Sequence, residues 1–185
     1  MAKIRVAAMV VLAAAASVSA AVNVAPSATA TASSAYGPGY TAEGVNDGVA
    51  AWQPGNAWCS GETAEPHWVQ LTWADPVLIG EVTVDHIGAG NSAYAALNTA
   101  DYLVQTWDGS DWITNASVIG NTANTTVSIF DAVTTTQLRL YVTKAAQMDG
   151  GDYDMARILE IGAAVPEPMT VALLGLGGLL VRRRT

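Results

Sequence analysis

Cysteine, histidine and basic residues are scarce in this 185-residue chain. A single cysteine, Cys59, excludes an internal disulfide framework and every metal site built from several cysteines. Eight Lys and Arg stand against sixteen Asp and Glu, which gives a formal net charge of −8. Most of the basic residues lie at the two extreme ends, and those of the interior are Arg139, Lys144 and Arg157. A charge-driven nucleic-acid binder needs a basic surface, so the sequence predicts no nucleic-acid partner.

Helical periodicity is also missing from the interior of the chain, residues 21–164. Short runs rich in Val, Ile, Thr, Trp and Tyr occur instead, separated by Gly, Asn, Asp and Pro, which is typical of strands. The length supports one domain, and eight such runs predict an all-β sandwich. The predicted strands are Ala28–Ser34, Trp68–Trp73, Ile79–His86, Tyr102–Trp107, Trp112–Ala116, Thr125–Phe130, Gln137–Thr143 and Ala156–Ile161.

Local patterns assign some side chains within these strands. Alternation in Trp68–Trp73 places Val69, Leu71 and Trp73 on one face and their neighbours on the other. The Asp-Gly pair at positions 108–109 predicts a hairpin turn, because tight turns need positive φ angles. Core packing is the simplest expectation for any one of the six tryptophans, with Trp52, in a loop, as the exception.

The N-terminus has the pattern of a secretory signal peptide. Lys3 and Arg5 precede an apolar run over residues 6–16, and residues 17–20 are the small residues that a signal peptidase accepts. The run is shorter than the roughly 20 residues that a membrane-spanning helix needs. We therefore predict a signal peptide over residues 1–20, cleaved by signal peptidase after Ala20. The alternative is a permanent N-terminal anchor.

The C-terminus combines three features over residues 165–185. They are the motif Val165-Pro166-Glu167-Pro168, an apolar segment over residues 169–181 that predicts a short hydrophobic helix, and a basic tail at residues 182–185. This order closely resembles the PEP-CTERM sorting signal of Gram-negative bacteria. The resemblance implies cleavage by a membrane-embedded exosortase, only transient membrane contact, and delivery to the cell surface or the extracellular exopolysaccharide matrix. The alternative is a membrane tail that stays uncut.

A series of motifs in the interior carries a second resemblance. In chain order they are Asn46-Asp47-Gly48, Trp58, PHWVQLTW, DYLVQTWDGSDW, QLRLYVT and RILEIG. The ordered set resembles the F5/8 type C, or discoidin-like, family and covers nearly the whole interior. The resemblance implies an eight-stranded jelly-roll β-sandwich of the galactose-binding-like type. Such modules often hold one structural calcium and bind sugars, or sometimes lipid or protein, through loops at one end.

The resemblance also implies a calcium site. The family uses an Asp of the early Asp-Gly loop and a Glu of the last strand, which correspond to Asp47 and Glu160. Asn56 stands where the family often has a Thr, and an amide oxygen can also bind calcium. Two carboxylates would partly neutralise a cation that prefers roughly six to eight oxygen ligands. The alternative is that Asp47 caps a turn and Glu160 is solvated or salt-bridged.

Sugar recognition needs an aromatic face for a pyranose ring and fixed polar groups for its hydroxyls. Loop residues of these types are Trp52, His67, His86, Asn91, Tyr94, Asp149, Asp152 and Tyr153, and the predicted ligand-binding residues are Trp52, His86, Asn91, Tyr94, Asp149 and Tyr153. Galactose-binding members commonly add an Arg, but none lies between Arg5 and Arg139, so a sugar site here would be built differently. The acidic segment 148–154 could hold a second cation, or could simply be a solvated hairpin tip.

No catalytic constellation is recognisable in the sequence. A G-x-S-x-G elbow is absent, and the acidic, Trp-rich setting of Cys59 does not favour a reactive thiolate. A carboxylate pair such as Glu62 and Glu65, or Glu81 and Asp85, would act as a glycosidase dyad only with suitable geometry. We therefore predict a secreted, non-catalytic module that binds polysaccharide through loop aromatics and holds a structural calcium. The alternative hypothesis is a structural matrix protein with no dedicated sugar site.

Overall fold

The structure is a computed structural model that describes residues 21–62, 65–148 and 154–165. The predicted signal peptide lies outside these residues, as does the predicted sorting signal apart from Val165. Within the described part of the chain, no helix is both long enough and apolar enough to cross a bilayer.

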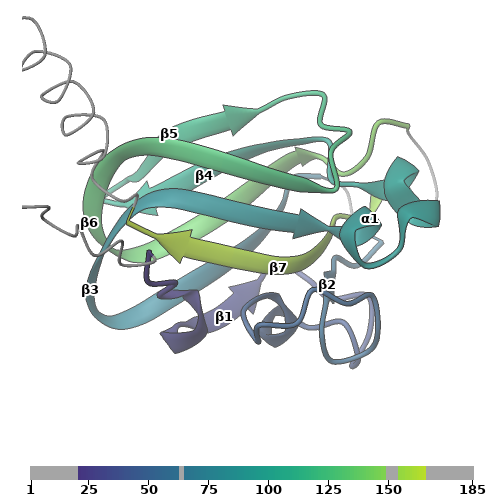
Figure 1. The fold of residues 1–185 in the computed structure, drawn as a ribbon, viewed down its shortest axis with the longest axis horizontal. Coiled ribbons are helices and arrows are strands. Elements are labelled where there is room, and N and C mark those ends of the chain that lie inside the picture. The colour runs from purple at the N-terminus through teal and green to yellow at the C-terminus, as the bar shows by residue number, and fades with distance from the viewer. Residues whose placement is uncertain (1–20, 63–64, 149–153, 166–185) are drawn as a thin grey trace, which may run out of the picture.

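The described residues form an all-β sandwich of seven strands, which confirms the predicted class (Figure 1). The strands are β1 (Thr29–Ala32), β2 (Trp58–Cys59), β3 (His67–His86), β4 (Asp101–Trp107), β5 (Trp112–Val118), β6 (Thr125–Lys144) and β7 (Arg157–Ala164). Four short helical segments accompany the strands. η1 (Ala25–Ser27) precedes β1, and the connections between strands contain η2 (Ala42–Val45), α1 (Ile87–Gly90) and η3 (Ser92–Leu97). All strand pairs are antiparallel.

The strand count differs from the prediction because β3 and β6 are each 20 residues long. β3 joins two predicted strands, and register shifts between Thr72 and Val77 and between Ile79 and Glu81 mark its bend. β6 likewise joins two predicted strands. Polar residues lie at both bends, and β3 also has Pro76 there. The chain bends at these residues, but the strand continues. The two-residue strand β2 was not predicted, because so short a run has no periodicity.

The bends let β3 and β6 contribute to both layers of the sandwich. The first half of β3 and the second half of β6 lie with β1, β4 and β5, which we call the five-stranded layer. The other halves lie with β7 and β2 in the four-stranded layer. The strand order β2-β7-β3-β6-β4-β5, with β1 beside β3, is therefore continuous through both layers.

The core lies between the two layers and follows the predicted alternation. Val69 and Leu71 are fully buried and Trp73 is 5% exposed, while Trp68 on the opposite face is partly exposed. Each fully buried aliphatic side chain contributes about 1.5–3 kcal/mol relative to an exposed one. Trp58 is also buried, and its indole N–H donates to the Ser34 carbonyl over 2.8 Å, so its polar atom is satisfied.

The two ends of the sandwich differ in structure. One end, which we call the loop end, carries β2, α1, η3 and the loop that contains η2 (Figure 1). The opposite end, which we call the bend end, carries the bends of β3 and β6 and the end of β7. The first described residues also reach the bend end, since the Val24 amide donates to the Ala163 carbonyl over 2.8 Å.

Candidate functional site

Close backbone packing holds the early Asp-Gly loop in place at the loop end. A Cβ on Gly44 would lie 2.4 Å from the Ala57 amide nitrogen, so this contact requires glycine. Asn46 is 8% exposed, and its side-chain amide donates to the carbonyls of Ala25 and Ala28 over 2.8 and 2.9 Å. The exposed residues that follow Asn46 are therefore attached to a fixed backbone.

Asp47, Asn56 and Glu160, which we call the carboxylate cluster, are brought together by this loop. The Asn56 amide donates to the Asp47 carboxylate. The Gly48 amide lies 3.2 and 3.3 Å from the two carboxylate oxygens of Glu160, although Glu160 is 112 residues away in the chain. Residues of an early loop and of the last strand thus converge. Asp47 also caps its own turn, as the alternative predicted, because it accepts from the Val49 amide over 2.7 Å.

The electrostatics of the carboxylate cluster oppose ionisation of Glu160. Burial raises the pKa of Glu160 to about 7, and the negative charges of Asp47 and Asp85 add to this effect. The Gly48 and Val49 amides act in the opposite direction. A bound cation would remove the electrostatic cost of holding these carboxylates together.

The donor set of the carboxylate cluster suits a hard cation such as calcium. It offers two carboxylates and one side-chain amide, all in or beside a loop. Among the described residues, no group of three or more His, Cys, Asp or Glu side chains converges on one point. A calcium ion held here would therefore need backbone carbonyls and water to complete its coordination.

A second part of the loop end brings Trp52 close to the helical segment that carries Asn91 and Tyr94. A Cβ on Gly90 would lie 2.8 Å from the Trp52 amide nitrogen, so the two backbones touch. The Asn91 carboxamide caps η3 by accepting from the Ala93 amide over 3.0 Å. Tyr94 is 42% exposed within η3. The structure thus brings the segments of these three predicted ligand-binding residues together.

Sequence reasoning missed two aromatic residues that accompany Trp52. The Trp52 ring stacks on Tyr40 with centroids 4.8 Å apart, and Tyr36 meets the edge of Tyr40 at 6.4 Å. Tyr36 is 56% exposed. The signal was present in the sequence as two tyrosines in a Gly- and Pro-rich loop, Tyr36-Gly-Pro-Gly-Tyr40.

The two histidines lie inside the sandwich, which corrects their expected place among the surface residues. His86 is fully buried, and its Nε2 lies 3.2 Å from the Thr126 hydroxyl. Burial lowers the pKa of His86 to about 4. His67 is 1% exposed, and its Nε2 lies 2.8 Å from the Asp154 carbonyl. Neither imidazole can touch a surface ligand in this conformation.

Three further candidates, Asp149, Asp152 and Tyr153, lie outside the described residues. Cys59 is buried in β2 at 3% exposure, which suits a packing role for its thiol.

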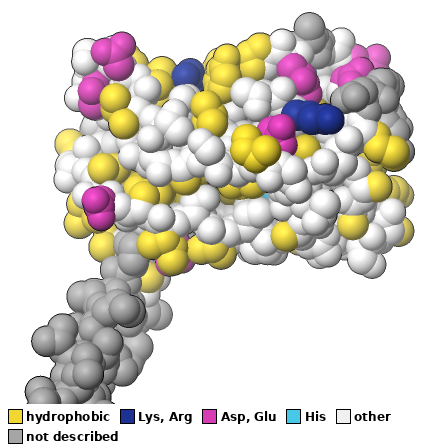
Figure 2. Space-filling view, turned by 90° about the horizontal axis from the view of Figure 1, so that it is seen from above, with side chains coloured by type: hydrophobic (Ala, Val, Ile, Leu, Met, Phe, Trp, Pro, Cys, Tyr) yellow, Lys and Arg dark blue, Asp and Glu magenta, His cyan; other side chains and the backbone are white. Residues whose placement is uncertain are grey.

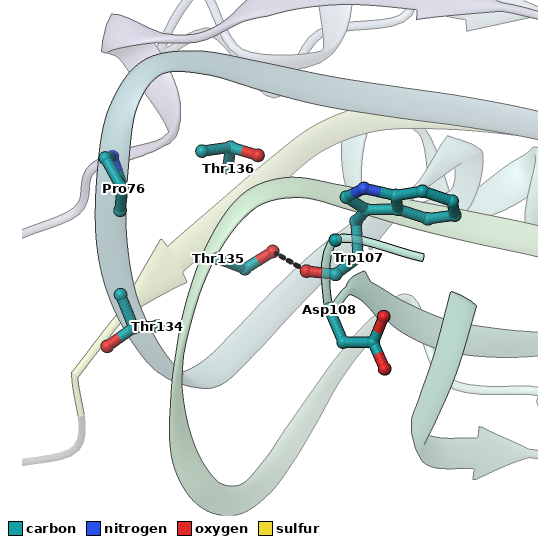
Figure 3. A pocket seen from close by; sticks show the side chains of 7 residues that line it. Pro76, Trp107, Asp108, Thr134, Thr135 and Thr136 are labelled. Atoms are coloured by element: carbon teal, nitrogen blue, oxygen red, sulfur yellow. Dashed lines mark hydrogen bonds between the residues drawn. The ribbon is translucent and has the colours of Figure 1, made fainter. Parts of the chain in front are cut away.

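Two shallow pockets lie away from the predicted ligand-binding residues. One, of about 280 Å³, opens at the bend end beside the β4–β5 turn (Figure 3). Figure 3 shows Pro76 and Thr134 on one side of this pocket, Trp107 and Asp108 on the other, and the Thr135 hydroxyl bonded to the Trp107 carbonyl over 2.8 Å. The other pocket, of about 360 Å³, lies between β1 and η2.

Comparison with known proteins agrees with this architecture. The F5/8 type C domain model matches residues 29–161. The family 32 carbohydrate-binding module of Streptococcus pneumoniae EndoD superposes with a TM-score of 0.64 at 25% identity, covering 77% of this chain and 98% of that one. No curated protein matches the sequence.

Two solved complexes also share the fold. Chitosan-binding module 2 from a Paenibacillus sp. IK-5 chitosanase/glucanase, in complex with chitotriose, has a TM-score of 0.62 at 20% identity and covers 77% of this chain and 100% of its own. The family 32 module of Clostridium perfringens NanJ, in complex with galactose, has a TM-score of 0.62 at 16% identity, with coverages of 77% and 98%. Since the domain model spans more than two thirds of the sequence and the sandwich has the same fold, the chain belongs to the F5/8 type C domain family.

Proposed function

We propose that this protein is a secreted, non-catalytic carbohydrate-binding module that holds a glycan at its loop end. The observation that carries the proposal is the contact between the Trp52 and Gly90 backbones. It places a partly exposed indole beside a segment with an exposed tyrosine, Tyr94, and a fixed carboxamide, Asn91. Flat aromatic faces and fixed polar groups are what a pyranose ring requires.

The solved relatives support the same class of ligand. Two of them were solved in complex with chitotriose and with galactose. Export to the cell surface or matrix is the setting that the sequence patterns at the two ends predict for this function.

We further propose that the carboxylate cluster binds a structural calcium ion. Asp47 and Glu160 would supply carboxylate oxygens, and Asn56 would supply its amide oxygen after rotation of the carboxamide. When bound, the ion supplies positive charge and no redox or acid–base chemistry. It would tie the early loop to β7 and so hold the loop end in its binding conformation.

The test is retention on an immobilised neutral polysaccharide, galactan. We expect Trp52→Ala and Tyr94→Ala to reduce retention about tenfold, because a lost ring contact costs about 1.4 kcal/mol or more. Ile129→Ala removes an exposed apolar side chain of β6 and is the matched control, with unchanged retention. A Trp52→Ala protein that melts earlier but keeps full retention would favour the structural-matrix alternative, in which Trp52 only packs on Tyr40.

A further inference from the structure

The outer face of the five-stranded layer carries a row of planar side chains that the loop-end proposal does not use. The row, which we call the ladder face, consists of Trp68 on β3, Arg139 and Tyr141 on β6, Trp107 on β4 and Trp112 on β5. All five residues are partly exposed. Such a concentration of aromatic rings on a solvent-facing sheet surface is unusual for a face with no partner.

Stacking contacts order the ladder face. The guanidinium carbon of Arg139 lies 4.2 Å from the Trp112 ring centroid and 4.9 Å from that of Tyr141. Trp112 meets Trp107 edge to face with centroids 5.5 Å apart. Trp68 and Tyr141 are direct cross-strand partners, so the row extends across four strands.

Three glutamines fix the polar groups between the rings. Gln105 accepts from Arg139 Nε over 2.7 Å and donates to the Thr114 hydroxyl over 2.9 Å. Gln70 donates to the Gln137 carboxamide over 3.1 Å. The ladder face thus combines apolar ring surfaces with oriented hydrogen-bonding groups, and these hydrogen bonds hold Arg139 in place.

The charge of Arg139 has no counter-ion among the described residues. Its contacts there are the two rings and Gln105, and its two terminal nitrogens donate no hydrogen bond to the described protein. This is unexpected in a chain with twice as many acidic as basic residues. Figure 2 shows acidic side chains toward both ends of the sandwich and few basic ones. Because Arg139 is partly exposed, its terminal nitrogens are accessible to a ligand from solution.

We propose that the ladder face binds an anionic polysaccharide whose pyranose rings carry carboxylates, with Arg139 as the carboxylate-binding residue. The terminal nitrogens of the guanidinium can donate two parallel hydrogen bonds to a sugar carboxylate. Neighbouring sugar rings would lie against the exposed parts of Trp112 and Trp68. At the bend end the row continues into the pocket of about 280 Å³, because Trp107 belongs to both.

This surface is separate from the loop end and does not depend on the glycan site proposed there. The loop-end site is formed by loop and helical residues, whereas the ladder face lies on strands of one layer. A module with both surfaces would hold two polysaccharide chains, or two parts of one chain, at once.

The test measures binding of a soluble oligogalacturonate by calorimetry to the full chain, with its methyl ester as the neutral probe of the same backbone. We expect the native protein to bind the acid form at least about tenfold more tightly than the ester, and less tightly at high salt. This comparison needs no variant, so it does not depend on whether a variant folds.

Two matched variants then locate the site. Arg139→Gln and Lys144→Gln change the net charge equally and lie on the same strand. We expect Arg139→Gln to weaken binding about tenfold or more, Arg139→Lys to restore part of it, and Lys144→Gln to leave it within about twofold.

Several results would overturn the proposal: no binding of the acid form, equal binding of the ester, or equal losses in the two glutamine variants. Loss of oligogalacturonate binding in Trp52→Ala would also overturn it, by moving the site to the loop end. Failure of neutral glycans to bind at the loop end would count against the proposed function alone.

Discussion

His86 is a buried imidazole whose surroundings oppose protonation. Burial lowers its folded-state pKa to about 4, from about 6.5 in the unfolded chain. As the pH falls below about 6.5, the unfolded state takes up a proton that the folded state does not accept until about pH 4. The free energy of unfolding should therefore drop by about 3 kcal/mol across this range from His86 alone. Urea titrations at pH 7 and pH 4 measure the loss.

The control for this prediction is His86→Phe, which keeps a planar ring. Thr126 would retain a partner in this variant, since it is also bonded to the Tyr102 hydroxyl. We expect the variant to lose less stability than the native protein between pH 7 and pH 4. Equal losses in both proteins would show that His86 is not the source.

Glu160 has the opposite pH dependence, because its folded-state pKa is raised to about 7. Its contribution to stability is complete below the unfolded value near 4.5 and is lost as the pH rises through about 7. Because Glu160 is only half-buried, solvent screening reduces this contribution to about 1 kcal/mol. Calcium should reverse the loss at pH 8, seen as a higher melting temperature.

Glu160→Gln and Asp47→Asn should each abolish the calcium-dependent rise in melting temperature. Glu81→Gln removes a carboxylate from β3 outside the carboxylate cluster and is the matched control, with the full rise expected. An unchanged calcium response in the first two variants would place any bound ion elsewhere.

Single residues also show where sequence reasoning succeeds and where it stops. Alternation assigned Val69, Leu71 and Trp73 to the core, because a strand has a period of two. The same rule places His86 on the buried face, together with Val82 and Val84. This pattern was overlooked because the side chain of His86 is polar. The proximity of Asp47, Asn56 and Glu160 was expected only from the family resemblance, since no local rule joins residues so far apart.

At the scale of elements, the β4–β5 hairpin depends on one backbone conformation. Gly109 has a φ of 109°, and no atom lies within 4 Å of a Cβ placed there, so only backbone strain opposes a side chain. Gly109→Ala should therefore destabilise the protein by about 1 kcal/mol in urea unfolding. Gly37→Ala is the control, because Gly37 has an equally open Cβ position without a positive φ. Equal effects of the two substitutions would contradict this account.

The hairpin was predictable because Asp-Gly is a local signal, whereas the bends of β3 and β6 were not. Residues such as Asp75 and Pro76 interrupt the apolar pattern, and interruption normally ends a strand. Here the chain stays extended because both halves of β3 find partners in β6. This outcome depends on tertiary pairing between distant segments, which a single sequence does not display.

At the scale of the whole molecule, the two long strands should make unfolding cooperative. β3 and β6 run through both layers, so the two layers are joined by continuous strands as well as by their shared core. We expect the denaturation curves from tryptophan fluorescence and from far-ultraviolet circular dichroism to coincide. Two separated transitions would show that one layer unfolds while the other remains.

The arrangement of the ends sets the reach of the module. β7 and the first described residues meet at the bend end, so a tether attached on either side leaves from the face opposite the loop end. A tethered copy would present its loop end outward, at the tip farthest from the point of attachment. The length of the tether would then set the distance over which the loop end can reach a glycan. The tether itself would not cover the loop end.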